Sequence, residues 1–559
     1  MSSRNVFYFA SAWLAFNWIQ AAWLPLDPDE AYYLLYAARL DWGYFDHPPM
    51  TAFFIRAGQA LFPGAFGARF FFPVLQLVAF GLLRRLAGSP TDRAGLLFFF
   101  ALLAAMPFFH VFGFIATPDS PLLFFTAAYL WALDGLLRHN NWKFALLLAA
   151  AMAGLLYSKY HGLLVIGFSL LPYWRKILDL KWVSAGLIAL ALYMPHLNWQ
   201  YRHDFISIRY HLLGGRDDLY ELKYTLNYLL NQFLVFSPLL FPFIIRAVYH
   251  SVKAGTKGIE AACRWMIIGF WAFFLYSTGK GHVEPQWTAA LTPAIVLILW
   301  NRYRPPNQGS ALVRKMAVAG FVLLMIARTG LMLHLPGVKN PLEKWDWIAP
   351  VDSIAGNTPV VFQNSYRSPA QFTFQTGKKA YTLTDLYYRP SQFDLWGDER
   401  DLQNRSVWII GQGDWRVRGA REIKPPLNTF RIKKVDSLQV ARQVKLEFAI
   451  PDATYRPGDT LHLPVKLTNP YPFDIYPDRG DMPLSLWIIF DVPRDHGAIR
   501  MLEVQPERKT WPSGAGVELS ATAVIPARMS GEYRVSMGIA MGDLPPGYNS
   551  SAAKIVIAH

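Results

Sequence analysis

Three carboxylates stand within four residues near the start of the chain, at Asp27, Asp29 and Glu30. A helix beginning here would use Asp27 as its N-cap, Pro28 at its first position and the other acids in a first turn that the helix dipole favours. A cap needs one acid, however, and ionisable groups beside a membrane span are costly and more often functional. Asp29 is therefore predicted to be a general base that accepts a hydroxyl proton, with Glu30 assisting it.

Four further segments place charged residues between apolar stretches. Asp119, in Thr117-Pro118-Asp119-Ser120-Pro121, would on its own more simply be a helix cap. Lys159 either extends to the membrane surface or binds an anion. The other two segments combine cations with acids and His, although a solvated loop would look much like the first of them. They contain His203, Asp204, Arg209, His211 and Arg216, and then Lys280, His282 and Glu284 beside Gly279 and Gly281.

These side chains suit transfer of a group from an anionic lipid donor. A carboxylate would take the proton of an acceptor hydroxyl, and cations would neutralise the charge that develops on a phosphate leaving group. The predicted catalytic acids are Asp29, Glu30 and Asp119, and the cations predicted to bind the donor phosphate are Lys159, Arg209 and Lys280.

A metal site is a weaker possibility in the same segments. Carboxylate and imidazole ligands together suit zinc or a similar ion. A divalent metal, where one is bound, is expected at Asp46 with His211 or His282. Lone His residues near a membrane interface are usually structural or solvated, so the sequence requires no cofactor.

The elements that position these residues are predicted to be membrane helices. A hydrophobic fraction of 53%, with 40 Phe and 20 Trp in 559 residues, exceeds that of ordinary soluble domains. The net charge of +15 does not indicate a nucleic-acid partner, because many Lys and Arg residues lie in short linkers between apolar stretches. The single cysteine, Cys263, excludes an intramolecular disulfide.

About eleven apolar stretches are long enough to cross the bilayer, and the first is predicted to be a retained span rather than a signal peptide. Alternate linkers carry clusters of Lys and Arg, which by the positive-inside rule face the cytoplasm. The linkers with the predicted site, and the soluble part, then face the periplasm of a bacterial inner membrane. The spans lie near residues 6–26, 69–86, 94–113, 120–137, 143–157, 162–174, 182–198, 225–245, 265–279, 287–300 and 315–335.

The soluble part is predicted to hold two domains. Residues 339–437 read as an α/β domain, because 359–362 and 406–410 look like strands that bracket helical stretches. Residues 438–559 read as a β-sandwich, because short strands recur between Pro, Gly and Asp turns. The strands are expected near 443–450, 460–467, 484–490, 517–525 and 532–539. The transmembrane catalytic domain would then occupy residues 1–338, with a periplasmic loop at 27–68.

Six short motifs occur in one order along residues 1–435. They are Asp29-Glu30-Ala31-Tyr32-Tyr33, Trp42-Gly43-Tyr44-Phe45-Asp46-His47-Pro48-Pro49, Thr117-Pro118-Asp119-Ser120-Pro121, Ser158-Lys159-Tyr160-His161-Gly162, Gly281-His282-Val283-Glu284-Pro285-Gln286-Trp287 and Ser391-Gln392-Phe393-Asp394-Leu395-Trp396. Together they resemble the bacterial branch of the protein O-mannosyltransferase and aminoarabinose transferase superfamily, of the family 39 and 83 type. A chance match to all of them in order would be rare. The resemblance implies a polytopic α-helical GT-C fold, with amphipathic helices such as 50–62 on the membrane surface.

The resemblance also implies residue roles. The catalytic position falls on Asp29, with Glu30 as its partner. Asp46-His47 stands where aminoarabinose transferases have Glu-Lys, whose acid helps to hold a metal with a later His and whose Lys faces phosphate. His47 replaces that Lys, and His211 is the candidate for the later His. His47 is thus a further predicted phosphate ligand, and the predicted substrate contacts are Tyr32, Tyr33, His282 and Glu284.

The predicted function is inverting transfer of a hexosyl or pentosyl group from a polyprenyl (undecaprenyl) phosphate donor to a periplasmic acceptor. Lipid A, lipopolysaccharide, another glycan and protein hydroxyls are all candidate acceptors. A lipid or glycan transporter or flippase would also be polytopic with buried charge, although the charged residues here cluster on one face without an evident inverted repeat. A non-enzymatic envelope scaffold is a second alternative, but it would need far fewer spans.

Overall fold

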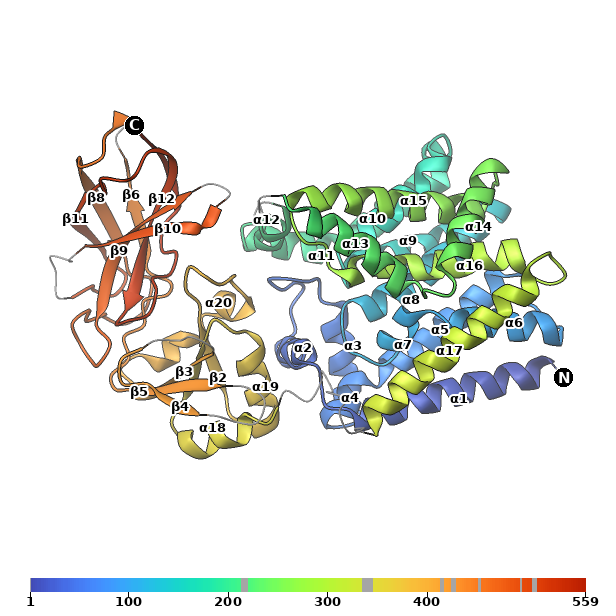
Figure 1. Ribbon diagram of the computed structural model, residues 1–559, viewed down its shortest axis with the longest axis horizontal. Helices are drawn as coiled ribbons and strands as arrows, with labels where there is room; N and C mark the ends of the chain where they lie inside the picture. Colours follow the sequence, from blue (N-terminus) through green and yellow to red (C-terminus); the bar gives the residue numbers. More distant parts are fainter. Residues whose placement is uncertain are drawn as a thin grey trace. The chain divides into compact units, whose positions relative to one another are not determined.

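The computed structural model describes residues 2–212, 220–333, 345–412, 417–423, 429–450, 454–492, 495–504 and 510–558. The chain forms two compact units, Met1–Glu343 and Lys344–His559, and each is described by itself (Figure 1). The predicted boundary between the membrane domain and the soluble part, at 338 and 339, falls outside the described residues.

The first unit is built from helices. In chain order they are α1 (Ser2–Trp23), α2 (Pro28–Ala38), α3 (Met50–Gln59), α4 (Gly64–Arg69), α5 (Phe71–Leu86), α6 (Arg93–Ala104), α7 (Pro107–Val111), α8 (Asp119–His139), α9 (Trp142–Ser158), α10 (Gly162–Leu170), α11 (Leu180–Arg202), α12 (Ile206–Leu212), α13 (Leu222–Val235), α14 (Phe241–Lys253), α15 (Ile259–Ser277), α16 (Thr292–Tyr303) and α17 (Ser310–Met332). Short 3-10 helices lie between some of them: η1 (Leu171–Tyr173), η2 (Lys176–Leu178), η3 (Thr278–Lys280) and η4 (Pro285–Leu291).

Several of these helices are suited to a membrane. Among the described residues, five helical stretches are long and apolar enough to cross one: Gly64–Leu86, Asp119–His139, Leu180–Arg202, Ile259–Lys280 and Ser310–Met332. Three shorter apolar helices accompany them, at Arg93–Ala104, Trp142–Ser158 and Gly162–Tyr173. The unit therefore has the character of a helical membrane protein, and the count of eleven spans stays a prediction.

Two predicted spans are interrupted near a proline. The span predicted at 94–113 ends with α6 and resumes at Pro107 as α7, and the span predicted at 225–245 is divided into α13 and α14. Ser237, which precedes Pro238, lies in this second break with a φ of 66°. Proline lacks a backbone donor and disfavours the helical conformation of the residue before it. Apolar composition alone did not reveal these breaks.

Helix α16 forms the centre of the first unit. Its residues from Thr292 to Trp300 are all buried, as expected of a helix that is apolar on every side. Helices α5, α6, α8, α14 and α15 pack against it. The indole of Trp300 also donates a hydrogen bond of 2.9 Å to the carbonyl oxygen of Ala87, which fixes the far end of α5.

The linker after α1 folds into the three helices α2, α3 and α4. Helix α3 buries Thr51, Ala52, Ile55 and Gly58, a spacing that places them on one side of the helix. It packs against α2, α4, α5, α8 and α9. The helix predicted at 50–62 is therefore present, although it ends at Gln59, and its position on the membrane surface stays a prediction.

The second unit begins with a five-stranded mixed sheet in the order β2-β1-β3-β5-β4. Strand β1 pairs in parallel with β2 and β3, and β5 pairs antiparallel with β3 and β4. The two strands predicted in this region are present as β1 and β3. The elements are α18 (Ile348–Ala355), β1 (Val360–Gln363), α19 (Arg367–Thr376), β2 (Ala380–Leu383), α20 (Gln392–Trp396), η5 (Asp398–Leu402), β3 (Val407–Gln412), β4 (Arg421–Ile423) and β5 (Phe430–Val435).

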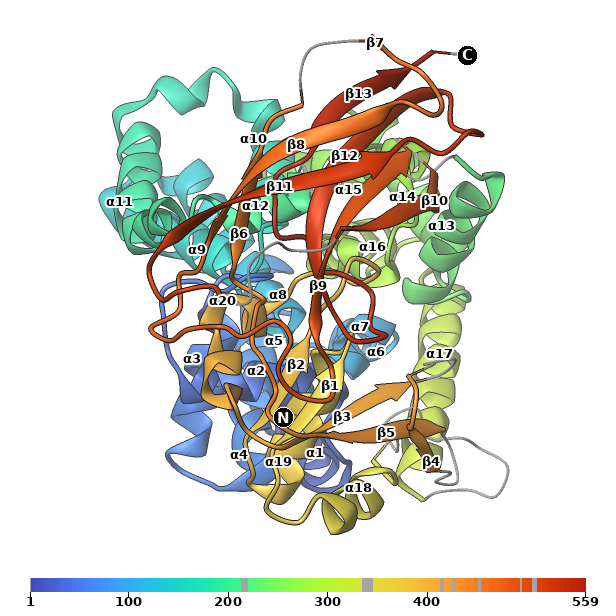
Figure 2. The same cartoon turned by 90° about the vertical axis from the view of Figure 1, so that its left-hand side faces the viewer.

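Two further sheets follow, in the orders β10-β9-β12-β13-β7 and β11-β8-β6. Every second residue of β8 and β11 is buried, so one face covers a core and the other faces solvent. The inward residues share a single hydrophobic core with those of β9 and β12. The paired strands β8 and β11 lie side by side in Figure 2. The strands are β6 (Lys445–Phe448), β7 (Thr454–Tyr455), β8 (Thr460–Thr468), β9 (Leu484–Val492), β10 (Asp495–Val504), β11 (Gly516–Val524), β12 (Gly531–Met541) and β13 (Ala553–Ile557).

Candidate active site

The acidic cluster lies at the start of α2, and two of its three members form the helix cap. The side chain of Asp27 accepts a hydrogen bond of 2.9 Å from the amide of Asp29, and the side chain of Glu30 accepts one of 2.7 Å from the amide of Asp27. This is a capping box with Pro28 at the first helical position. The capping interpretation is thus correct for Asp27 and Glu30, and the cap does not require the carboxylate of the half-buried Asp29.

Glu30 is fully buried and bound on both carboxylate oxygens. Arg69, at the end of α4, forms a two-pronged ion pair with it, in which Nε lies 2.7 Å from Oε1 and Nη2 contacts Oε2. The amide of Ala116 donates a further hydrogen bond of 2.7 Å to Oε1. A carboxylate held in this way can orient its neighbours, and it is not placed to receive a proton from a substrate. Sequence reasoning gave Arg69 no role.

Asp119 and Lys159 form a second buried ion pair. The ammonium of Lys159 lies 2.8 and 2.9 Å from the two carboxylate oxygens of Asp119, and the residues are only 6% and 5% exposed. The N-cap position of α8 is Pro118, so the interpretation of Asp119 as a simple cap is wrong. Lys159 follows α9 and turns inward, so it does not extend to the membrane surface. The structure brings together an acid and a cation that lie 40 residues apart in the sequence.

Aromatic and His side chains come together near this pair. They belong to the linker after α1, to the residues that follow Lys159, and to α12. The ring of His211, on α12, lies 5.2 Å from that of Tyr160 and 6.4 Å from that of His47. The ring of His47 packs edge-on against Tyr33 of α2, at 5.7 Å. Burial and the nearby Lys159 cation hold the pKa of His161 well below its ordinary value, so this imidazole is neutral at pH 7.

The two tyrosines predicted to contact substrate lie inside the protein. Tyr32 is 1% exposed and packs on Tyr36 with ring centroids 4.7 Å apart, and Tyr33 is 7% exposed beside His47. A direct role in binding substrate stays a prediction for both residues.

Two of the residues predicted as metal ligands, Asp46 and His211, are in contact through the backbone of Asp46. Nε2 of His211 lies 2.8 Å from the carbonyl oxygen of Asp46. Within the described ranges, no group of three or more His, Cys, Asp and Glu residues is arranged to hold a metal ion. The donor set that structural zinc usually requires is therefore absent from that part of the chain, and a metal at Asp46 stays a prediction.

The remaining predicted residues lie nearer the surface. Arg209 and Lys280 are exposed, on α12 and at the end of η3. His282 and Glu284 are each 37% exposed and face one another at 3.8 Å. The end of that linker reaches these aromatic and His side chains, since the ring of Trp287 lies 5.9 Å from that of His161. Arg216 lies outside the described residues.

The loop that contains Asp46 and His47 is hydrogen-bonded to two side chains of α11. The indole of Trp199 donates a hydrogen bond of 2.8 Å to Asp41, and a ring nitrogen of His196 lies 2.7 Å from the carbonyl oxygen of Trp42. Sequence reasoning missed both α11 residues. A run of His and Trp near the end of a long apolar helix, in His196-Leu197-Asn198-Trp199, was the available signal.

Replacing Gly43 with Ala should loosen this loop. A Cβ atom at Gly43 would lie 2.4 Å from the ring of Trp199 and 3.0 Å from that of His196. We expect Gly43→Ala to destabilise the protein by about 1–3 kcal/mol. Thermal unfolding in detergent measures this. Gly186→Ala on the same helix α11 is the control, because its Cβ would meet no atom within 4 Å. Equal melting temperatures for the two variants would contradict the expectation.

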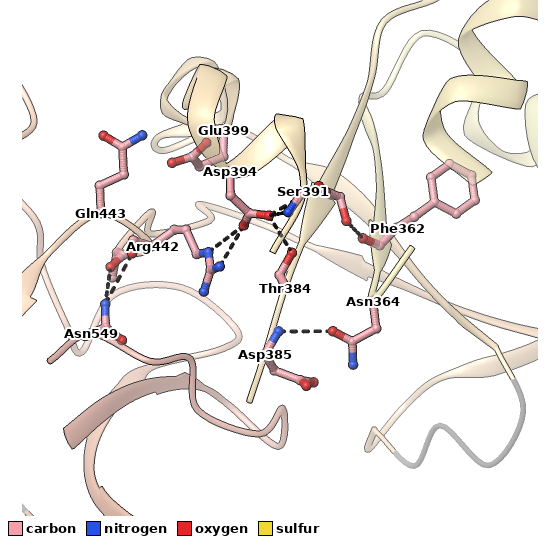
Figure 3. Close-up of polar contacts among 12 residues, drawn as sticks. Phe362, Asn364, Thr384, Asp385, Ser391, Asp394, Glu399, Arg442, Gln443 and Asn549 are labelled. Carbon is pink, nitrogen blue, oxygen red and sulfur yellow. Dashed lines mark hydrogen bonds and ion pairs between the residues drawn. The ribbon is translucent and has the colours of Figure 1, made fainter. Parts of the chain in front are cut away.

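The motif that runs from Ser391 to Trp396 lies in the second unit, where its polar side chains cap a helix and bind a neighbouring arginine (Figure 3). Asp394 closes a capping box with Ser391 at the start of α20. Its carboxylate also accepts hydrogen bonds from Arg442, at 2.8 Å from Nε. The same arginine borders a small cavity of about 60 Å³ with Asp385 and Asn549. These contacts join the mixed sheet to the strands that follow and indicate no chemistry.

Comparison with known proteins finds a family match within the first unit. A family model described as dolichyl-phosphate-mannose-protein mannosyltransferase matches residues 46–199, which include Asp119 and Lys159 but begin after Asp29. The chain is also similar to the lipid A galacturonosyltransferase RgtD of Rhizobium johnstonii, with 24% identity over 291 residues. That similarity covers 49% of this chain and 60% of the relative.

Solved structures share the fold. ArnT from Cupriavidus metallidurans matches in the apo state with a TM-score of 0.59 and 13% identity, and bound to undecaprenyl phosphate with 0.56 and 14%. Each match covers 77% of this chain and 98% of ArnT. The covered share exceeds the first unit, so the likeness continues into the second. The family match and the curated relative make part of this chain similar to glycosyltransferases, and the solved structures show that its fold resembles that of ArnT.

Proposed function

We propose that this protein transfers a sugar from a polyprenyl-phosphate donor to a glycolipid acceptor in the cell envelope. One observation carries the proposal. Through Glu30, the turn that bears Asp29 is hydrogen-bonded to Ala116, three residues before the Asp119 that binds Lys159. A candidate base and a buried cation are therefore held in one connected structure, as transfer from a phosphate leaving group requires.

The reaction proceeds as one displacement with inversion. The acceptor hydroxyl oxygen attacks the anomeric carbon, the bond from that carbon to the phosphate oxygen breaks, and polyprenyl phosphate leaves with the bonding electron pair. The carboxylate of Asp29 receives the hydroxyl proton. A cation near the phosphate stabilises the negative charge that the leaving group gains.

Lys159 is the proposed cation at the phosphate. An ammonium carries three N–H donors, and the pair with Asp119 accounts for two of them. The third can reach a phosphate oxygen while Asp119 keeps the ammonium in place. Exposed Arg209 and Lys280, together with His47, would complete phosphate binding, and His282 and Glu284 would contact the sugar or acceptor.

The names of the relatives guide the choice of substrates. One similar protein is a lipid A galacturonosyltransferase, and the ArnT structure contains undecaprenyl phosphate. By analogy we propose an undecaprenyl-phosphate-linked sugar as donor and lipid A or a related glycolipid as acceptor. The site would face the periplasm, with the α/β part at 339–437 and a β-sandwich at 438–559 in the same compartment.

The orientation predicts which exposed positions an impermeant reagent reaches. In a Cys263→Ser background, cysteines at Gly279 and Ser520 should react with an impermeant maleimide in cells with a permeabilised outer membrane, because the proposed orientation puts both positions in the periplasm. Cysteines at Ala254 and Gln308 should react only after the inner membrane is opened. All four residues are exposed. Reaction of Ala254→Cys but not Gly279→Cys in intact cells would reverse the orientation.

Mass spectrometry of envelope glycolipids tests the proposed function. Cells that lack the gene should lose one glycolipid species and accumulate another lighter by one sugar, and the wild-type gene should restore the heavier species. A gene that encodes Asp29→Asn should not restore it. An unchanged glycolipid profile, with a mass loss on envelope proteins instead, would reject the proposed acceptor.

A further inference from the structure

Arg69 joins three neighbouring segments of the first unit. Its guanidinium is fully buried, and all five of its N–H groups donate hydrogen bonds. Two of these bonds reach Glu30. The other three reach the carbonyl oxygens of Ala21, Leu24 and Pro25, at 3.1, 2.7 and 2.9 Å. The side chain thereby fixes α4 to the end of α1 and to the start of α2.

The carboxylate of Glu30 extends this connection to a fourth segment. Its oxygens accept two hydrogen bonds from Arg69, one from the amide of Asp27 and one from the amide of Ala116. Ala116 lies in the segment just before α8. Asp29 precedes Glu30 directly, and Asp119 follows Ala116 by three residues, so both carboxylates lie beside this connection.

We infer that Arg69 is a positioning residue that holds the first turn of α2 against the segment before α8 and so fixes the distance between Asp29 and the Asp119–Lys159 pair. This inference rests on the proposed function, because the distance matters to chemistry only when Asp29 and Lys159 act on the same donor and acceptor. A buried ion pair contributes little net stability, so geometry accounts for it better than stability does.

The planar guanidinium is essential to this role. Its donors point in fixed directions toward five acceptors, whereas a lysine ammonium offers three donors from one point. Arg69→Lys therefore keeps the charge but cannot make all the contacts to Glu30 and to the three carbonyl oxygens at and just after the end of α1. We expect kcat to fall by roughly tenfold to a hundredfold while the donor KM changes less than about twofold, because a small misplacement of a base costs rate rather than donor binding.

Arg328 on α17 provides the matched control. It is also a buried arginine, 5% exposed, and its hydrogen bonds go to Gln20 at 2.5 Å, to Asn17 at 2.7 Å and to a ring nitrogen of His110 at 3.2 Å. Arg328→Lys makes the same substitution at another buried arginine, one that binds two side chains of α1. It should lower the melting temperature at least as much as Arg69→Lys does and keep kcat within about threefold of wild type. Equal losses of kcat in the two variants would overturn the inference.

Hydrogen exchange tests, independently of enzymatic activity, whether Arg69 holds the first turn of α2 against the segment before α8. In Arg69→Lys, peptides that cover residues 27–36 and 114–120 should exchange faster than in wild type, and in Arg328→Lys they should not. Unchanged exchange in Arg69→Lys would overturn the inference. Should Arg69→Lys not fold, Glu30→Gln, which removes the carboxylate that binds Arg69 and the amide of Ala116, is measured in its place and must give the same pattern. Wild-type protein that transfers no sugar would reject the proposed function, while the exchange result would still decide whether Arg69 fastens the two segments.

Discussion

Asp29→Asn should lower turnover by a factor on the order of 10² or more while leaving folding and donor binding intact. The amide keeps the size of the carboxylate and most of its hydrogen bonding, but it cannot accept the acceptor proton. The helix cap does not depend on this side chain, because Asp27 and Glu30 form it. The purified variant is compared with wild type in steady-state assays and in donor-binding titrations.

Asp27→Asn is the matched control for this substitution. It removes a carboxylate two residues away, and Asn caps helices as well as Asp does. Turnover of Asp27→Asn should therefore stay close to wild type. Near-normal turnover of Asp29→Asn, together with loss of turnover in Asp119→Asn, would move the base to the start of α8. Full turnover in both would leave the acidic cluster with a capping role alone.

Lys159→Met should reduce both stability and turnover. It leaves the carboxylate of Asp119 buried without its cation, which costs about 3–5 kcal/mol. It also removes the proposed phosphate contact, so donor binding should weaken and turnover should fall by roughly 10²-fold. Thermal unfolding, donor titration and steady-state kinetics give the three readings.

The double variant Lys159→Met, Asp119→Leu separates the two effects. Replacing both partners of a buried ion pair by apolar residues of similar volume is often neutral, so most of the lost stability should return. Activity should not return, because the cation is still missing. A double variant that regains both stability and turnover would show that the pair is structural and that the phosphate is bound elsewhere.

The local elements of this protein could be predicted from its sequence because each leaves a periodic or terminal pattern. Alternating burial in β8 and β11 follows alternating apolar residues, and the predicted strands at 460–467 and 517–525 match them within one residue. The acidic cluster with Pro28 correctly marked the start of α2. Breaks at Pro107 and Ser237 were missed because the flanking residues are uniformly apolar.

Contacts between distant segments could not be predicted in the same way. The pairs Lys159–Asp119 and Arg69–Glu30 join residues 40 and 39 positions apart, and packing rather than spacing decides them. Lys159 was selected for its unusual position, but its pairing with Asp119 was not foreseen, and its role at a phosphate stays a prediction. One feature of the sequence could have pointed to Arg69. It stands at the predicted outer end of a span, where the positive-inside rule makes an arginine unusual.

A transfer assay with the purified protein in lipid nanodiscs tests the central claim most directly. The probe is a polyprenyl-phosphate-linked sugar extracted from membranes of the source cells, presented with envelope glycolipid as acceptor, and both lipid products are followed by mass spectrometry. We expect polyprenyl phosphate and a glycolipid heavier by one sugar to appear in equal amounts, and Asp29→Asn to abolish both. Donor that stays intact in the presence of wild-type protein, but crosses the bilayer of sealed vesicles that contain this protein, would rule out sugar transfer and identify a transporter.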